Sequence, residues 1–546
     1  QRIFRVRRNY NKWVANQTLE DFALRFTGKA ARRWSAGRVA NTALGAISFL
    51  ALEAIGGAIT LNYGFTNAVA AIAVVSAVIF LLGLPVSYYA ARYGVDIDLL
   101  TRGAGFGYLG STLTSLIYAS FTFIFFALEA AIMAMALEVL FGLPLTLGYV
   151  VSSLVAIPLV THGITYISRF QLWTQPVWVV LQLAPFVFIL FQDPESLSRW
   201  QGFDGALGGD GAFNLVLFGA AATVMFSLVA QIGEQVDFLR FMPEPGPERK
   251  QRRRWWLAML AGGPGWIIVG GLKALAGSFL AVLAFSHGLP HGLAQEPMHM
   301  YLVAFSHITT HPATLMALAG IFVVLSQLKI NVTNAYAGSI AWSNLVINKP
   351  LGLSPKGIEF KRAYLYDINP VGFGAMVMAT LVGLVARSGF WGDDAEALAS
   401  FLALLTAFVT SPLIALLTDG RYYIARTPEP ATATRGRPCC ICEHRFDDED
   451  MAFCPAYNGP ICSLCCSLDA RCNDACKHHA RFQEQLMDWL GGVLPQRIVV
   501  HLRSRLGHFV GLLALVTLVM AGLLTLVYTQ VAITDPQVRD LMATTL

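Results

Sequence analysis

Charged residues are scarce in this chain of 546 residues, because Asp, Glu, Lys and Arg make up only 13% of it. Ordinary soluble domains carry about 25%. This deficit excludes a soluble enzyme, a disordered chain and a nucleic-acid-binding protein. Hydrophobic residues make up 55%, and they form runs of about 20, the length that spans a bilayer as a helix. The runs do not alternate polar and apolar residues as barrel strands do. We therefore expect an all-α polytopic membrane protein.

Cysteine is absent from the apolar bulk, because all nine cysteines lie between Cys439 and Cys476. Such a cluster is typical of a metal site in a reducing compartment and not of a disulfide framework. The N-terminal 37 residues lack the short apolar core and cleavage site of a signal peptide. No catalytic motif occurs in residues 1–546.

Ten apolar spans are predicted before the cysteines and an eleventh after them. Their approximate bounds are 39–62, 66–92, 104–140, 147–165, 170–191, 213–240, 257–285, 312–344, 369–388, 397–419 and 508–531. Lys and Arg gather in loops of one parity, such as 240–254 and 349–362, whereas 192–212 and 286–311 hold almost none. Because cytoplasmic loops carry the positive charge, the N-terminus and the cysteine-rich insert are predicted to be cytoplasmic.

The pattern divides the chain into seven segments. They are an interfacial N-terminal segment (1–37), a permease-like domain (38–425), a linker (426–437), a cysteine-rich metal-binding module (438–480), an amphipathic connector (481–506), an additional transmembrane helix (507–532) and an external tail (533–546), beyond which we expect the chain to continue.

Two glutamates lie inside predicted spans, where ionisable residues are costly and usually functional. Glu53 precedes the pair Gly56-Gly57 in span one, and Glu234 follows Gly233 in span six. These spans open two five-span halves. Interrupted helices at corresponding positions of two halves indicate a transporter site at the bilayer midplane. The alternative is glycine-mediated close packing of two helices.

Span three carries Glu129 one turn after Phe125, so the two side chains share a helix face. A ring next to a hydrogen-bonding carboxylate suits a planar or cationic small ligand. The alternative for Phe125 alone is a residue that fills the core or faces lipid.

Span eight carries a polar stripe, since Gln327, Asn331 and Asn334 are spaced i, i+4 and i+7. Lys329 lies about 200° around the helix from Gln327 and faces a different neighbour. A buried lysine needs a partner, and we expect the glutamates of spans one and six to supply it. A lysine that extends to the membrane surface is the alternative. The depth of Lys273 in span seven is not fixed by the pattern.

Several motifs, in order along residues 15–425, resemble the nucleobase–cation symporter-1 family of purine, pyrimidine and hydantoin permeases. They are Leu-Glu-Asp-Phe-Ala-Leu-Arg at 19–25 with Arg33-Trp34, Leu-Thr-Arg-Gly-Ala-Gly-Phe-Gly at 100–107, Val-Asp-Phe-Leu-Arg at 236–240, Asn-Val-Thr-Asn-Ala-Tyr at 331–336 and Thr-Asp-Gly-Arg-Tyr-Tyr at 418–423. The resemblance implies a LeuT-type fold with two inverted five-helix repeats and a site between helices one, three, six and eight.

The resemblance also assigns site residues. By position, Phe125 matches the third-helix aromatic residue and Glu129 the Gln one turn later, Glu53 the first-helix Gln, Asn334 an eighth-helix Asn and, more loosely, Phe226 the sixth-helix aromatic residue. The predicted substrate site comprises Glu53, Phe125, Glu129, Phe226, Gln231, Asn331 and Asn334, with Lys329 and Glu234 as a coupling pair in place of an ion site.

The departures from the family concern charge. Two family glutamines are glutamates here, and Lys329-Ile330 replaces the small hydroxyl residues that help to hold sodium. An ammonium there would stand in for sodium, so we expect no sodium and either proton coupling or none. The acidic replacements favour a ligand with a cationic or donor-rich edge, unless Lys329 neutralises one of them.

The cysteine insert and later span also resemble the membrane part of certain bacterial hybrid sensor histidine kinases. This implies a sensor in the bacterial inner membrane that binds a small nucleobase-like solute and signals to a kinase domain beyond Leu546, with a homodimer as a further partner. The alternatives are a genuine secondary transporter, proton-coupled or uncoupled, and a structural membrane anchor, which the polar residues in the spans disfavour.

The cysteine spacing predicts zinc. Cys439-x-x-Cys442 and Cys462-x-x-Cys465 are two knuckles that suit one tetrahedral ion. Cys454, Cys466, Cys472 and Cys476 are predicted to hold a second ion, with His444, His478 or His479 able to replace one of them. Metal would supply folding energy to a segment too short and polar to bury a core. An iron–sulfur cluster and a redox-sensing thiol cluster are the alternatives.

Overall fold

The structure is a computed structural model that describes residues 26–208, 211–347, 361–427, 436–468, 472 and 474–493, with scattered residues between 495 and 522. The chain divides into two units, residues 1–478 and 479–546, and each is described by itself. The predicted motif at 19–25 and the loop lysines Lys349 and Lys356 lie outside the described residues.

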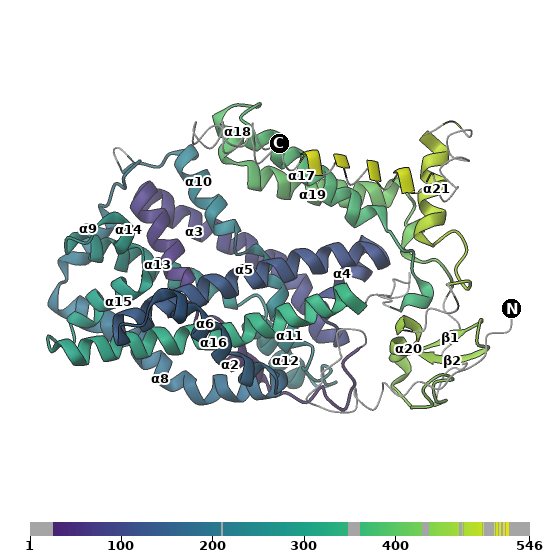
Figure 1. The fold of residues 1–546 in the computed structure, drawn as a ribbon, viewed down its shortest axis with the longest axis horizontal. Coiled ribbons are helices and arrows are strands. Elements are labelled where there is room, and N and C mark those ends of the chain that lie inside the picture. The colour runs from purple at the N-terminus through teal and green to yellow at the C-terminus, as the bar shows by residue number, and fades with distance from the viewer. Residues whose placement is uncertain are drawn as a thin grey trace. The chain divides into compact units, whose positions relative to one another are not determined.

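Helices form most of the first unit (Figure 1). Their bounds are α2 Ala36–Ala46, α3 Ala51–Tyr93, α4 Ile97–Thr101, the π-helix η1 Arg102–Phe106, α5 Gly107–Phe141, α6 Leu145–Val155, α7 Ile157–Val160, α8 Gly163–Gln192, α9 Glu195–Gln201, α10 Leu215–Phe226, the 3-10 helix η2 Val229–Gly233, α11 Glu234–Leu239, α12 Arg249–Gly262, α13 Trp266–Ser286, α14 His291–Ala294, α15 Pro297–Ser306, α16 Pro312–Ile347, the 3-10 helix η3 Arg362–Tyr364, α17 Pro370–Arg387, α18 Asp393–Ala397 and α19 Ala399–Leu417.

In the described part of the chain, 8 helical stretches are long and apolar enough to cross a membrane. One of them, α3, covers the predicted first and second spans, which meet at Gly64, where the backbone leaves helical geometry. Gly64 has φ 80°, and a Cβ there would lie 2.4 Å from Asp204 O, so only glycine fits this bend. Another stretch, Leu145–Val160, is shorter. The count of ten spans therefore stays a prediction.

Both spans that were expected to be interrupted are interrupted. Span one consists of α2, the four irregular residues 47–50 and the start of α3. Span six changes from α10 through η2 to α11. The expected position of the first break is wrong, because Gly56 and Gly57 lie inside α3, and Glu53 lies in its first turn.

Gly56 instead allows α3 and α13 to pack closely. A Cβ on Gly56 would lie 1.8 Å from Ala274 O, and a Cβ on Gly277 of α13 would lie 2.2 Å from the backbone of Glu53. Glycine at both positions lets the two backbones touch. This contact places the side chains of α13 next to the break in span one.

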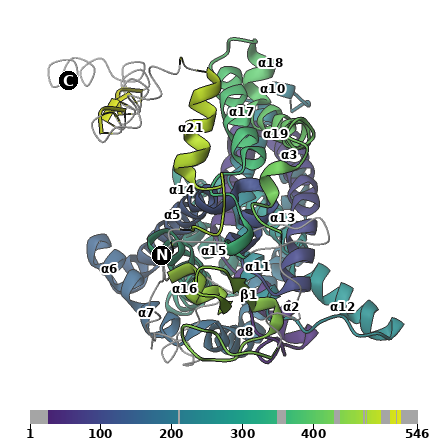
Figure 2. The same cartoon turned by 90° about the vertical axis from the view of Figure 1, so that its right-hand side faces the viewer.

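Four short helices lie in loops that the sequence pattern left irregular: α9, α14, α15 and α18. Of these, α15 matters for the core, because Tyr301 and Phe305 are fully buried within it. The pair α17 and α19 runs side by side in both views (Figures 1 and 2).

The cysteine-rich module contains a two-stranded antiparallel sheet, β1 Met451–Cys454 with β2 Gly459–Cys462, followed by α20 Ser463–Leu468. Met451 pairs with Cys462 in this sheet, and Cys454 pairs with Gly459. Ala363 and Tyr364, which precede α17, belong to the same buried cluster as the cysteines. The module therefore shares its core with the segment that leads into α17.

The second unit contains α21 Phe482–Val493 within the predicted amphipathic connector. The predicted additional transmembrane helix lies mostly outside the described residues, although those of its residues that are described are helical. The tail at 533–546 lies wholly outside them.

Candidate functional site

The break in span one exposes backbone groups that need partners, because a polar group in an apolar interior is costly without one. Two neighbouring helices supply them. Lys273 Nζ of α13 donates to Ser48 O at 3.1 Å. The amide of Leu50 donates to Gln327 Oε1 of α16 at 3.2 Å. The irregular segment is therefore fixed by side chains from spans seven and eight.

Glu53 lies at the centre of a buried polar network next to this break. Its Oε1 is 3.0 Å from Lys273 Nζ and accepts a hydrogen bond from the hydroxyl of Tyr301 at 3.2 Å. Gln182 of α8 donates to the Tyr301 hydroxyl at 2.7 Å. Lys273 Nζ also lies 5.2 Å from the centre of the Trp178 ring. Lys273 is thus the cationic partner of Glu53.

Glu129 of α5 is joined to the same break by a different route. Gln327 Nε2 donates to the Glu129 carboxylate and, at 3.2 Å, to the Glu129 carbonyl oxygen. Since Gln327 also accepts from Leu50, one amide side chain connects Glu129 to span one. Glu53 and Glu129 are both fully buried. The structure therefore brings the two predicted carboxyls to opposite sides of one interrupted backbone.

The aromatic residues of the predicted site separate. Phe125 packs edge-on against Phe49, which lies in the break, with ring centres 6.4 Å apart. Phe226 packs against Phe401 of α19 at 4.9 Å. Phe125 therefore lines the break, whereas Phe226 contacts a different helix.

The expected carboxylate partner of Lys329 is wrong. Lys329 Nζ donates to Thr174 Oγ1 and to Gln175 Oε1, both at 3.0 Å, and lies 3.5 Å from Gln171 O. All three acceptors are neutral and belong to α8. The ammonium turns toward span five because α16 presents opposite faces to α5 and α8, as the 200° separation from Gln327 requires.

Glu234 also lies away from the network around Glu53. Its carboxylate accepts a hydrogen bond from Gln231, three residues earlier in the same interrupted span. Asn331 and Asn334 are buried in α16, and neither amide has a hydrogen-bond partner among the described residues. The structure thus does not join these four residues to Glu53 and Glu129 by any contact.

Four polar residues of the network were not predicted: Trp178, Gln182, Tyr301 and, as a partner of Glu53, Lys273. A pattern on span five would have indicated one of them. Gln171, Gln175 and Gln182 are spaced i, i+4 and i+11, a single helix face, and all three are buried. A line of buried glutamines in an apolar helix indicates a polar interior.

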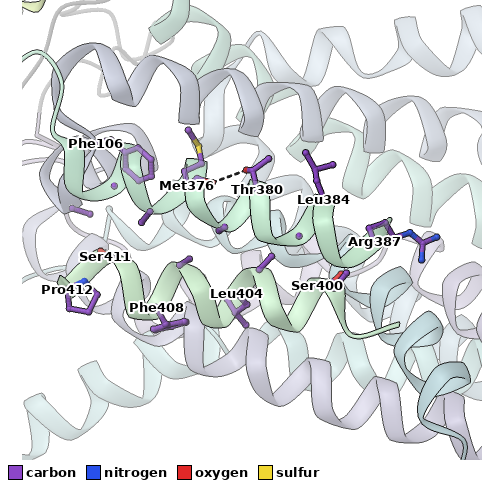
Figure 3. Close-up of a pocket in the computed structure, with 18 of the residues that line it drawn as sticks. Phe106, Met376, Thr380, Leu384, Arg387, Ser400, Leu404, Phe408, Ser411 and Pro412 are labelled. Carbon is purple, nitrogen blue, oxygen red and sulfur yellow. Dashed lines mark hydrogen bonds between the residues drawn. The ribbon is translucent and has the colours of Figure 1, made fainter. Parts of the chain in front are cut away.

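A groove of about 1040 Å³ runs between α17 and α19 (Figure 3). Small and apolar residues line most of it, including Gly372, Ala379 and Ala403. None of the predicted site residues is among those that line it. Because exposed apolar side chains of α19 surround it, this groove is open to lipid in a membrane and is not the candidate solute site.

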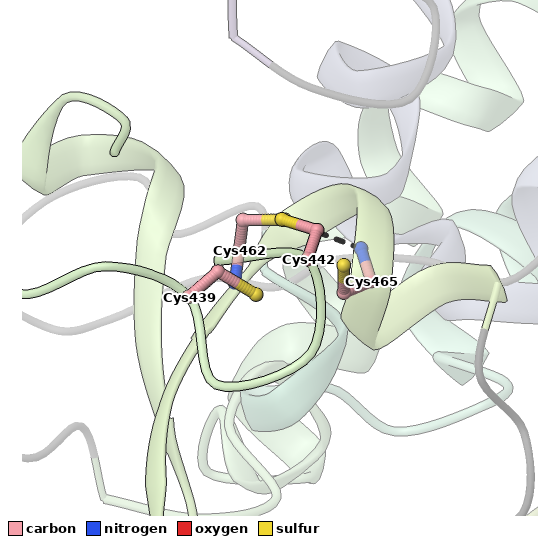
Figure 4. A group of neighbouring side chains, drawn as sticks. All are labelled: Cys439, Cys442, Cys462 and Cys465. Carbon is pink, nitrogen blue, oxygen red and sulfur yellow. Dashed lines mark hydrogen bonds between the residues drawn. The ribbon is translucent and has the colours of Figure 1, made fainter. Parts of the chain in front are cut away.

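Four cysteines form a candidate metal centre (Figure 4). The sulfurs of Cys439, Cys442, Cys462 and Cys465 all lie within 4.8 Å of one another, and all four residues are buried. Tetrahedral zinc with Zn–S bonds of about 2.3 Å places its sulfurs about 3.8 Å apart. The donor set and its spacing therefore fit zinc.

Hydrogen bonds in the cluster favour a thiolate. Contacts with the thiols of Cys442, Cys462 and Cys465 hold the pKa of Cys439 well below its usual range. The Cys439 sulfur also accepts from the amide of Cys462 at 3.4 Å. Thiolates are the form that binds metal.

The second predicted ion has no equally tight cluster in the part of the chain that the structure describes, where a single group of such ligands occurs. Its expected ligands are Cys454, Cys466, Cys472 and Cys476. Burial raises the pKa of Cys454 to about 11, which favours the thiol over the thiolate. The second ion stays a prediction.

No family model matches the chain, and no curated protein matches it. Three solved structures are similar to it. Mhp1 in an inward-facing conformation matches with a TM-score of 0.50 and 15% identity, over 72% of this chain and 93% of that chain. Mhp1 described as a nucleobase-cation-symport-1 family transporter, closed with bromovinylhydantoin bound, gives 0.45 and 17%, over 72% and 95%. A Na⁺-coupled sialic acid symporter gives 0.45 and 14%, over 74% and 96%.

At this identity the first likeness establishes the fold. The chain is an all-α polytopic membrane protein with the LeuT-type fold. That fold is shared with secondary transporters, and it carries here a cysteine-rich module in which four cysteines suit a metal ion.

Proposed function

We propose that this chain binds a small nitrogenous, nucleobase-like solute at the interrupted first span and carries or senses it across the membrane. The observation that supports this is the break at residues 47–50, held by Lys273 and Gln327 between two buried carboxyls. Interrupted helices at the midplane are where transporters of related architecture bind solutes. Glu53, Glu129 and Phe125 are the proposed contacts, with Asn331 and Asn334 as further donors and acceptors.

The cysteine-rich module favours a sensing role in addition to binding. Arg362, just before α17, donates through Nε to Asp474 of the module at 3.2 Å and through Nη1 to Cys466 O at 3.1 Å. The amide of Leu109 in the first turn of α5 donates to Asp367 O at 2.6 Å. A shift of α5 on solute binding would therefore reach the module. We propose zinc in this module, a cytoplasmic position in a bacterial inner membrane, and coupling to a C-terminal histidine kinase.

The alternative is a genuine secondary transporter, coupled to protons or uncoupled, in which the module is regulatory. Purified full chain in proteoliposomes separates the two. Labelled uracil, cytosine and hydantoin are tested for binding and for uptake. Saturable binding without uptake supports the sensor, and uptake supports the transporter.

Glu53→Gln and Glu129→Gln are both expected to weaken binding by tenfold or more. Glu138→Gln is the matched control, because Glu138 lies on the same helix as Glu129 but is exposed. Binding that survives the double change Glu53→Gln with Glu129→Gln would remove this site from the proposal.

A further inference from the structure

The network around the first break contains more acidic than basic groups. Glu53 and Glu129 are fully buried, and Lys273 is the ammonium between them. The charged groups that act on Glu129 are Lys273 of α13 and Glu53 of α3. Lys273 forms its 3.0 Å ion pair with Glu53. Glu129 is left with a neutral partner, Gln327.

The other helices near Glu129 add no compensating cation in the described residues. On α16 the ammonium of Lys329 turns to α8. From α8 comes Gln182 and from α15 comes Tyr301, both neutral donors. Arg102 and Asp98 meet α5 at Ser111 and Ser115, about 20 Å or more along the helix from Glu129. α6 carries no charged residue, and Glu234 of the interrupted sixth span is itself acidic.

An ionised carboxylate that is buried without a cation is very costly. With one ammonium for two carboxyls, the empty site holds a proton on Glu129. The same site has unused acceptors. Glu53 Oε2, Glu129 Oε1 and Gln182 Oε1 are buried and have no hydrogen-bond partner among the described residues. Each of these three oxygens accepts a proton-bearing donor, and the rings of Phe49 and Phe125 lie alongside.

We propose that the solute is a monocation rich in N–H donors, such as an amidine or a protonated amino-heterocycle, and that it binds in exchange for the proton of Glu129. The step is balanced: the neutral carboxyl of Glu129 loses one proton to water, and the resulting carboxylate pairs with the entering cation. The Lys273–Glu53 pair stays intact throughout. This inference rests on the proposed function and specifies the ligand class of the same site.

Benzamidine and benzamide form a matched probe pair, because the first is a monocation at neutral pH and the second is a neutral molecule of the same shape. Calorimetric titration of the purified full chain in two buffers of different ionisation enthalpy counts the protons released. Benzamidine is expected to bind at least tenfold tighter than benzamide and to release about one proton. Because binding expels a proton, its affinity should rise with pH, by at most about tenfold per unit, until Glu129 is ionised.

Glu129→Gln should abolish the proton release and the preference for the cation, and Glu138→Gln should leave both unchanged. Equal or tighter binding of benzamide, or of uracil, without proton release would overturn this inference and leave the proposed function standing. Failure of cationic and neutral probes alike to bind would overturn both. A sodium titration with the same heat and proton release as benzamidine would assign the site to the metal cation instead.

Discussion

Lys477 of the cysteine-rich module lies with its Nζ 3.3 Å from Oδ1 of Asp367, and the side chain of Lys477 is fully buried. Asp367 also accepts, through its carbonyl oxygen, the hydrogen bond from Leu109 at the start of α5. One residue thus contacts both the module and the helix that carries Glu129. Metal binding and solute binding are connected through this short segment before α17.

Breaking that contact should destabilise the chain strongly. Lys477→Met leaves Asp367 and Asp474 without their ammonium, and removing one member of a buried pair costs about 3–5 kcal/mol. We expect a lower midpoint of thermal unfolding and faster hydrogen exchange in residues 439–465. Arg387→Gln is the control, because its pair with Glu396 is largely exposed, at 65% and 41%, and such pairs contribute at most about 1 kcal/mol. Equal effects of the two changes would contradict the role of Lys477.

Metal analysis tests the four-cysteine centre. The purified full chain should contain one tightly bound zinc ion in the cluster, and Cys462→Ser should lower the metal content by one ion per chain and unfold the module, because metal binding supplies its folding energy. Cys440→Ser is the control, since Cys440 adjoins Cys439 but is not in the cluster. A module that stays folded after chelation, judged by unchanged protection of residues 439–465, would show that zinc is not required.

Pattern alone was sufficient for the features that depend on one segment. The apolar runs, the two interrupted spans and the pair of cysteine knuckles are local, and the structure contains each of them. The pairing of charges was not predictable. Lys273 and Lys329 both lie in apolar spans, and which of them meets Glu53 depends on how closely α13 approaches α3. That approach depends on Gly56 and Gly277, which sequence pattern could equally assign to a bend.

The glycine contact between α3 and α13 is itself testable. Gly277→Ala would place a Cβ 2.2 Å from the backbone of Glu53, so the helices must separate. Overpacking of this kind costs about 1–3 kcal/mol or more, and Lys273 would move away from Glu53 with its helix. We expect a lower unfolding midpoint and weaker solute binding. Gly37→Ala in α2 is the control, because no atom lies within 4 Å of a Cβ there; a comparable loss from this change would contradict the packing argument.

A double-mutant cycle distinguishes the two buried lysines. Lys273→Met removes the cation from Glu53 and should cost about 3–5 kcal/mol, whereas Lys273→Met in a Glu53→Gln background should cost much less, because no charge is left unpaired. The coupling energy between the two positions should therefore exceed about 1 kcal/mol. Lys329→Met should also destabilise the chain, by about 1–3 kcal/mol, since Thr174 and Gln175 lose their donor. Its cost should be the same whether residue 53 is Glu or Gln. Coupling of Glu53 to Lys329 instead of Lys273, measured by unfolding of the purified chain in detergent, would restore the original expectation for Lys329 and reject the ion pair seen in the structure.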